Sequence, residues 1–171
     1  LAGCVMVVGL YLIIVPLLPV ASHRLKSTPQ LASAEDTEAI PKENRLILPS
    51  AKVDSEIVEG SNISVINNGN VWRRPAASNN PENGNMVIVG HNYTYRDPTP
   101  PLFGLNDSNI GDDVRLYWQG KSYSYKIVSK QIVSPSAVEI ENPTDKPTLT
   151  IYTCYPLFIA NQRLVVQAEL K

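Results

Sequence analysis

The chain begins with a long apolar run, and its first formally charged residue, Arg24, comes only after that run. Residues 1–22 read LAGCVMVVGLYLIIVPLLPVAS and contain no Asp, Glu, Lys or Arg. A helix of roughly 20 mostly apolar residues spans the hydrocarbon core of a bilayer, so we expect a transmembrane anchor over residues 1–22. Two alternatives stay open. One is a signal peptide cleaved near Ala21, and the other is a buried core helix, whose last turn Pro16 and Pro19 would break.

A polar segment follows the apolar run. Residues 23–44 include STPQLASAEDTEAIPKEN, which is rich in Ser, Thr, Pro, Ala and Glu and has no sustained apolar periodicity. Such a composition buries little apolar surface and is typical of a linker. We expect a linker or stalk here, with a short helix from about Leu31 to Ile40 as the alternative.

The pattern changes again at Arg45, where short runs of β-branched and aromatic residues begin to alternate with Pro, Gly, Asn and Asp. This alternation is typical of strands separated by turns. It predicts one all-β domain over residues 45–171, a barrel or sandwich of about seven to eight strands. A tight hairpin turn is expected at Gln119-Gly120. The predicted strands are Arg45–Leu48, Ser55–Val58, Met86–Gly90, Asp113–Trp118, Ser122–Val133, Thr148–Thr153 and Arg163–Leu170.

Charge and cysteine content narrow the classes of function. The formal net charge of -1 gives no basic excess for binding a phosphate backbone, so we expect no nucleic-acid partner. Only two cysteines occur, and Cys4 lies in the apolar run, so a disulfide with Cys154 is not expected. Cys154 is therefore a free thiol, which is either a buried apolar residue or a nucleophile.

Cys154 stands where a predicted strand ends. It follows the run 148–153, and Pro156 stops the strand two residues later. Arg163 comes nine residues after the cysteine and opens the next apolar strand. A hairpin between the two strands would return the guanidinium to the sulfur, because paired strands lie about 5 Å apart.

His91 occupies a similar junction. It is one of two histidines in the chain and follows the apolar run 85–90. A histidine after a core strand is as often structural as functional. The only histidine and the only cysteine of the folded domain both stand at the ends of predicted strands. Arg163 also stands at a strand end, and this combination favours a catalytic site.

The sequence resembles the sortase family at four places. Residues 84–91, GNMVIVGH, are similar to the sortase segment in which the catalytic histidine follows Gly-Asn and an apolar strand. Residues 150–154, TIYTC, are similar to the signature Thr-Leu-x-Thr-Cys. Residues 161–166, NQRLVV, are similar to the strand that carries the sortase arginine, and residues 45–49, RLILP, are similar to the start of the barrel.

The resemblance extends over about residues 45–170, with two departures. Ile151 stands where the signature usually has Leu, which is a mild change in a buried strand. Residues 72–81, WRRPAASNNP, fit the family poorly. The run Cys154-Tyr155-Pro156, with Arg163 at short spacing, is most similar to the compact sortases of classes D and E.

The resemblance implies a closed sortase-type β-barrel preceded by a transmembrane helix, and a cysteine transpeptidase activity. It implies that Cys154 is the nucleophile and that His91 is the general acid and base. Arg163 would hydrogen-bond the substrate or the developing oxyanion. Thr153 and Tyr155 are expected to support the substrate and the oxyanion site.

The resemblance also implies partners and a location. The expected substrates are surface proteins or pilins with an LPxTG-like or LAxTG-like sorting signal, and the acceptor is an amine of a cell-wall peptide or a pilin. We expect a single-pass membrane protein with an extracellular catalytic domain, although the basic Arg24 and Lys26 would favour the cytoplasmic side. A hydrolase of the same signal and a non-catalytic, membrane-tethered peptide-binding module are the alternatives.

Metal binding is the weakest signal in the sequence. Glu139, Glu141 and Asp145 lie between the last long strands, and some sortases use acidic residues there for calcium. Solvated loop charges are the plainer interpretation. No His and Cys cluster suggests zinc, so we expect no cofactor.

Overall fold

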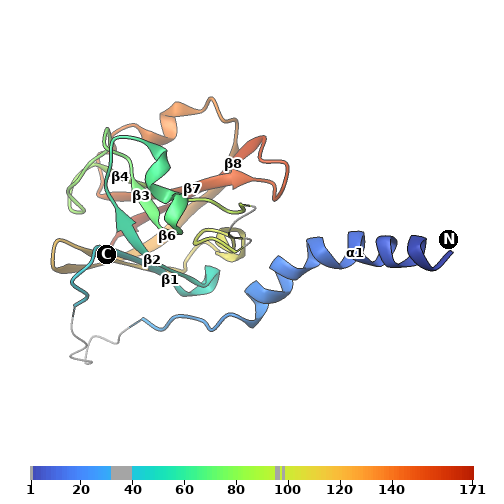
Figure 1. Cartoon of the computed structure of the whole chain (residues 1–171). Helices are drawn as coiled ribbons and strands as arrows, with labels where there is room; N and C mark the ends of the chain where they lie inside the picture. The colour runs from blue at the N-terminus through green and yellow to red at the C-terminus, as the bar shows by residue number, and fades with distance from the viewer. Residues whose placement is uncertain (1, 32–39, 95–96, 98) are drawn as a thin grey trace.

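The computed structural model describes residues 2–31, 40–94, 97 and 99–171. Within these residues, the domain is a closed barrel with strand order β1-β2-β3-β4-β7-β8-β6-β5, which Figure 1 shows beside a single long helix. The expected all-β closed barrel is therefore confirmed. The strands are β1 (Arg45–Leu48), β2 (Val53–Val58), β3 (Val71–Arg73), β4 (Asn85–Val89), β5 (Asp113–Trp118), β6 (Lys121–Val133), β7 (Thr148–Tyr155) and β8 (Gln162–Leu170).

The strand predictions hold except at β3. Strands β1 and β5 have the predicted bounds, and Trp118 pairs with Lys121 across the expected hairpin. The two turn residues, Gln119 and Gly120, have φ values of 50° and 74°, as the hairpin turn that matches strand twist requires. The missed strand β3 is three residues long and buried throughout, so it has no polar–apolar alternation to reveal it.

Two apolar clusters hold the barrel together. The larger one fills the interior, and two of its aromatic side chains also bind the connection between β3 and β4. Trp118 donates from Nε1 to the Asn79 carbonyl at 2.9 Å, and the Tyr125 hydroxyl donates to the Pro81 carbonyl at 2.7 Å. The smaller cluster lies outside the main core and consists of Ile66, Trp72, Val87 and Val89, with Tyr152 packed against it.

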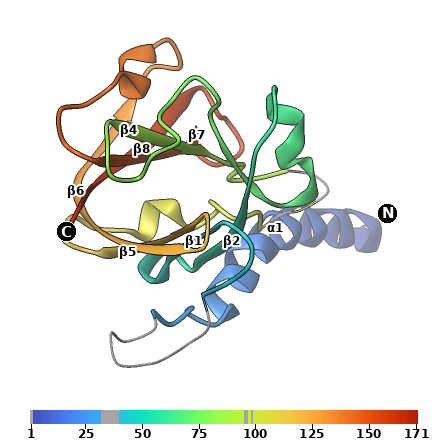
Figure 2. The ribbon, with the colours of Figure 1, turned by 90° about the vertical axis from the view of Figure 1, so that its left-hand side faces the viewer.

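Strands β4, β7 and β8 are neighbours in the barrel although β4 is about 60 residues away in sequence (Figure 2). β4 pairs with β7 in parallel, and the last pair of that ladder is Val89 with Tyr152. β8 pairs with β7 in antiparallel fashion. The ends of β4 and β7 and the start of β8 therefore lie at one edge of the barrel.

Helix α1 (Ala2–Leu25) extends from the barrel at the N-terminal end of the chain (Figure 1). It continues three residues past the predicted anchor, so the prolines do not end it. In the described part of the chain, no unbroken helix has the length and hydropathy of a membrane span. The segments Val5–Val15 and Leu17–Leu25, bent by 43°, reach them only as a pair. The alternative helix near Leu31 falls mostly outside the described residues.

Candidate active site

The parallel ladder of β4 and β7 sets His91 beside Cys154. Each residue comes two positions after the last ladder pair, Val89 with Tyr152. Where two parallel strands stop pairing at the same level, the residues that follow lie at the same edge of the sheet, and the two chains are about 5 Å apart. His91 and Cys154 accordingly line one cavity of about 230 Å³.

The antiparallel ladder of β7 and β8 adds Arg163. Cys154 and Arg163 are directly paired residues of these strands. One guanidinium nitrogen, Nη1, lies 3.5 Å from the Cys154 sulfur and also donates to the Gln162 carbonyl at 3.1 Å. The structure thus brings Cys154, His91 and Arg163 to one edge, and we call these three residues the Cys–His–Arg cluster.

The connection between β7 and β8 closes one side of this cavity. Phe158 and Ala160 line it with positive φ values of 70° and 56°. The Phe158 ring meets the Tyr93 ring edge to face, with centroids 4.7 Å apart. Aromatic side chains therefore flank the sulfur and the imidazole, and they give an apolar wall to a site whose chemistry involves charge.

Burial lowers the pKa of His91 below its usual value of 6.5. The imidazole is therefore neutral over more of the range around neutrality, which suits it to accept a proton. No hydrogen bond joins His91 to Cys154 within the residues that the structure describes. Both groups are thus available to contact a substrate placed between them.

Two further polar side chains brace the ends of β4 and β7. The buried Thr153 hydroxyl donates to the Gly90 carbonyl at 2.7 Å, so it points away from the cavity and ties the strands together. The expected support of the substrate and the oxyanion by Thr153 stays a prediction. Asn92 donates from Nδ2 to the Cys154 carbonyl at 2.5 Å. Asn92 was missed because only its position after His91 marks it in the sequence.

Tyr155 lines a second cavity, of about 240 Å³. The end of α1 contributes Val20, His23 and Arg24 to the lining of this cavity, which also includes Cys154. The contact is specific, because Lys52 donates from Nζ to the carbonyls of His23 and Arg24 at 3.2 and 2.7 Å. The end of α1 is thus part of the surroundings of the cysteine.

His23 is itself buried in this contact. Its ring packs against Phe103, with centroids 5.0 Å apart, and its Nε2 lies 3.5 Å from an Asp107 oxygen. Gly104 approaches the ring so closely that a Cβ there would lie 2.4 Å from Nε2. Burial lowers the pKa of His23, and the nearby Asp107 carboxylate acts in the opposite direction.

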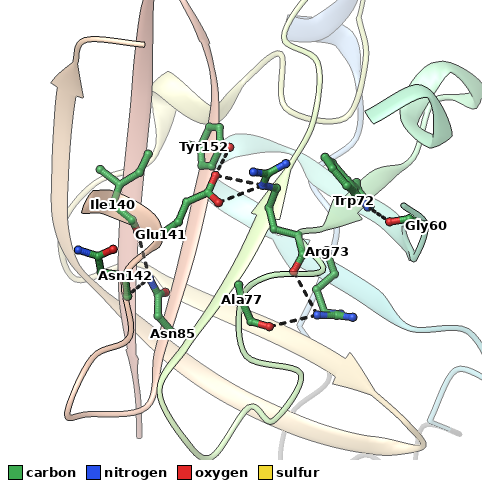
Figure 3. A network of polar contacts seen from close by, with 10 residues as sticks. Gly60, Trp72, Arg73, Ala77, Asn85, Ile140, Glu141, Asn142 and Tyr152 are labelled. Atoms are coloured by element: carbon green, nitrogen blue, oxygen red, sulfur yellow. Dashed lines mark hydrogen bonds and ion pairs between the residues drawn. The ribbon is translucent and has the colours of Figure 1, made fainter. Parts of the chain in front are cut away.

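Tyr152 belongs to a further polar group near the site. It precedes Cys154 by two residues, so the two side chains lie on the same face of β7. The Tyr152 hydroxyl donates to Glu141 Oε1 at 2.6 Å (Figure 3). Arg74 Nε donates to the two Glu141 oxygens at 3.1 and 3.0 Å. We call Arg74, Glu141 and Tyr152 the loop clamp. Glu139 and Asp145, the other acidic residues considered for calcium, are exposed.

The acidic loop residues belong to no cluster of metal-ligating side chains within the described part of the chain. Across the described residues, no group of three or more His, Cys, Asp and Glu side chains is placed to hold a metal ion. Both oxygens of Glu141 already accept hydrogen bonds from Arg74.

The fold and the cluster define a closed β-barrel with a free thiol, an imidazole and a guanidinium at one edge. Residues 46–171 match the family model of the Sortase domain. The chain is 31% identical over 88 residues to the sortase-like protein YwpE of Bacillus subtilis (strain 168), covering 51% of this chain and 83% of that protein. The chain therefore belongs to the sortase family, whose members act as cysteine transpeptidases.

Solved structures agree with this assignment. A Clostridium perfringens sortase D5 transpeptidase superposes with a TM-score of 0.65 at 22% identity, covering 80% of this chain and 83% of that one. Sortase E1 from Streptomyces coelicolor, determined with a tripeptide in its active site, gives a TM-score of 0.66 at 26% identity, covering 75% and 87%. Both likenesses are compatible with the predicted similarity to classes D and E.

Proposed function

We propose that this protein is a membrane-tethered sortase that cleaves an LPxTG-like or LAxTG-like sorting signal and transfers the protein to an amine. The observation that carries the proposal is the meeting of Cys154, His91 and Arg163 at the adjoining ends of three neighbouring strands. The tripeptide in the active site of the Streptomyces coelicolor relative supports a peptide substrate.

The first half of the reaction forms a thioester. His91 takes the proton of the Cys154 thiol, and the resulting thiolate attacks the carbonyl carbon of the signal threonine, whose oxygen becomes an oxyanion. Arg163 lies 3.5 Å from the sulfur, so its guanidinium is close enough to donate to that oxygen. The carbon–nitrogen bond then breaks, and His91 gives its proton to the departing amine.

The second half reverses these roles. The acceptor amine enters the place that the leaving amine occupied, and neutral His91 takes its proton while the nitrogen attacks the thioester carbon. A new amide forms, and the Cys154 thiolate is released. The acceptor amine thus replaces the proton that His91 gave to the leaving amine, and no oxidant or further reactant is needed.

Sortases are generally membrane-associated enzymes of the cell surface, and the surface of α1 supports such a location here. Large apolar side chains of α1, from Val5 to Leu18, are 40–76% exposed. Apolar surface of this extent is unfavourable in water and favourable in lipid. We infer a membrane anchor at α1 and an exported catalytic domain, with sorting-signal-bearing surface proteins or pilins as substrates and no cofactor.

The test is to offer the full chain in detergent a library of LPxTG-like and LAxTG-like peptides, each with a candidate amine, and to identify the products by mass spectrometry. A new amide between the acyl fragment and the amine is the expected product. Free acid alone, whatever amine is added, would establish a hydrolase instead. Peptide binding with no covalent product would establish a binding module.

A further inference from the structure

The connection between β7 and β8 presents apolar side chains to solvent at the edge of the barrel that holds the Cys–His–Arg cluster. Residues 156–161, PLFIAN, contain no charged side chain. The Ala160 amide donates to the Pro156 carbonyl at 2.9 Å, which closes the segment into a tight turn. At its tip, Phe158 and Ile159 are 54% and 68% exposed. Exposed apolar groups of this size are unfavourable in water, so the tip is suited to an apolar partner.

The two apolar side chains of the tip have different surroundings. The Phe158 ring packs against Tyr93, with centroids 4.7 Å apart, and it lines a cavity that contains Cys154. Ile159 lines neither of the two cavities described at the cysteine. Phe158 therefore belongs to the site already described. Ile159 is a surface residue that the reaction does not use, so it can be substituted without altering the cavity walls.

Helix α1 lies beside the same connection. Leu157, next to the tip, and Val20 of α1 line one cavity, together with Cys154. Figure 1 shows the connection between β7 and β8 projecting from the side of the barrel from which α1 leaves. The tip and the exposed apolar side chains of α1, from Val5 to Leu18, therefore lie on the same side of the molecule.

The end of α1 is fixed to the barrel, so the direction of the helix also sets the orientation of the barrel. Lys52 donates from Nζ to the carbonyls of His23 and Arg24 at 3.2 and 2.7 Å. The His23 ring is buried against Phe103. A barrel that is tethered only by a flexible linker has no preferred face toward a bilayer, whereas these contacts give the barrel one.

Basic side chains mark the level at which α1 leaves a bilayer. Residues 1–22 contain no Asp, Glu, Lys or Arg, and Arg24 and Lys26 follow them and are exposed. Cationic side chains next to an apolar helix are favourable at the anionic head groups of a membrane surface. Asp107 is the acidic residue in the lining of the cavity that contains Arg24 and Cys154, and Arg24 and Lys26 outnumber it. With α1 inserted, the edge that carries the cysteine lies near the head groups.

We propose that the tip of the connection between β7 and β8 is a second membrane contact of this protein, and that Ile159 enters the head-group region of the bilayer that holds α1. The inference rests on the proposed function, because it takes α1 as the membrane anchor. It follows from three observations: the exposed and uncharged tip, its position on the side from which α1 leaves, and the fixed end of α1. The cavities at Cys154 then open close to the lipid head groups.

The test places a tryptophan at the tip of the full chain, which is reconstituted into vesicles of phosphatidylcholine and phosphatidylglycerol whose acyl chains are brominated close to the head group. Bromine quenches tryptophan emission at short range. The Ile159→Trp variant should therefore lose emission relative to the same variant in vesicles without bromine. The native Trp72 and Trp118 are 2% and 1% exposed, so they supply an equal background in every variant.

Lys121→Trp is the matched control. Lys121 is exposed and begins β6, whereas Val133, at the other end of this strand of 13 residues, pairs with Arg163 of the cluster. A strand of this length extends roughly 40 Å, so a tryptophan at residue 121 lies far from the catalytic edge. Its emission should be the same in vesicles with and without bromine.

Flotation of the vesicles on a density gradient separates the two conclusions. If the chain floats with the vesicles but bromine quenches Ile159→Trp no more than Lys121→Trp, the second contact does not exist, and the inference is overturned while the anchor stands. A chain that does not float with the vesicles has no membrane anchor. That result would overturn the proposed location, and the inference with it.

Discussion

One face of β7 carries two polar groups that lie two residues apart and are organised in opposite ways. In the loop clamp, the hydroxyl, carboxylate and guanidinium satisfy one another at 2.6–3.1 Å. In the Cys–His–Arg cluster, the Cys154 sulfur has a single weak contact at 3.5 Å. His91 makes no side-chain hydrogen bond within the residues that the structure describes.

The difference follows from what each group must do. A polar group that holds a loop gains from being saturated, because every unmade hydrogen bond weakens the contact. A group that meets a substrate must leave its donors and acceptors free until the substrate arrives. We therefore expect the cluster to carry the chemistry and the clamp to hold the loop, and substitutions can test this division.

The largest effect is expected at Cys154. Cys154→Ala should reduce peptide cleavage to below about 10⁻⁴ of the normal rate, because no other thiol of the domain can form the thioester. The fold should persist, since the side chain is only partly buried and alanine fits any strand. Rates by mass spectrometry, with thermal unfolding as the control, give the answer. Substantial cleavage by the folded variant would show that the nucleophile lies elsewhere.

His91 comes next. His91→Ala should lower kcat by about 10²–10⁴-fold, the usual contribution of a general acid and base. Stability should change by less than about 1 kcal/mol, because the ring makes no hydrogen bond that folding depends on. Steady-state rates and urea unfolding should be measured on the same preparation. A variant that unfolds readily but keeps its kcat would indicate a structural histidine.

Substitutions of Arg163 distinguish the contribution of its positive charge from that of its planar guanidinium. Arg163→Ala should reduce kcat/KM by about 10²–10³-fold, as loss of an oxyanion donor does in other acyl-transfer enzymes. Arg163→Lys should recover only part of this loss, because an ammonium cannot reproduce the planar fork. Arg45→Lys, at an exposed pair on β1, is the control. Normal thioester formation in both Arg163 variants would leave the oxyanion to backbone groups alone.

The fold was predictable where the pattern of residues is local. Strands β1 and β5 have the predicted bounds because each alternates or ends at a clear turn. Strand β3 was missed because its three residues are all buried by contacts with distant strands. Such tertiary burial overrides local pattern. The extension of α1 past its prolines likewise reflects the contacts of His23 and Lys52, which lie 29 residues apart.

The site was predictable for residues that stand at strand ends. The pairing of Cys154 with Arg163 follows from a hairpin, and the structure contains that pair. The neighbourhood of His91 and Cys154 depends on a parallel pairing of β4 with β7, for which only the family resemblance gave a signal. The loop clamp was not foreseen, because Arg74 and Glu141 are 67 positions apart and no periodicity links them.

The smallest expected effect is on the pH dependence of stability, to which His91 of the cluster and Tyr152 of the clamp should contribute differently. Burial lowers the pKa of His91 from 6.5, whereas burial and the Glu141 carboxylate raise that of Tyr152 far into the alkaline range. Within the cluster, His91 therefore takes up its proton below its usual value of 6.5, whereas the Tyr152 hydroxyl of the clamp keeps its proton near neutrality. As the pH falls below about 6.5, the unfolded chain binds a proton at residue 91 more readily than the folded protein does.

The free energy of unfolding should consequently be highest above about pH 6.5 and decrease as the pH falls through the range just below it. His91→Gln removes this titration, so the variant should lose less stability than the unaltered protein between about pH 7.5 and 5.5. Urea unfolding at both pH values measures the difference. His23, whose burial also lowers its pKa, is present in both proteins and cancels. Equal losses would mean that His91 is as well hydrated in the folded protein as in the unfolded chain, which would contradict the partly enclosed site described for the cluster.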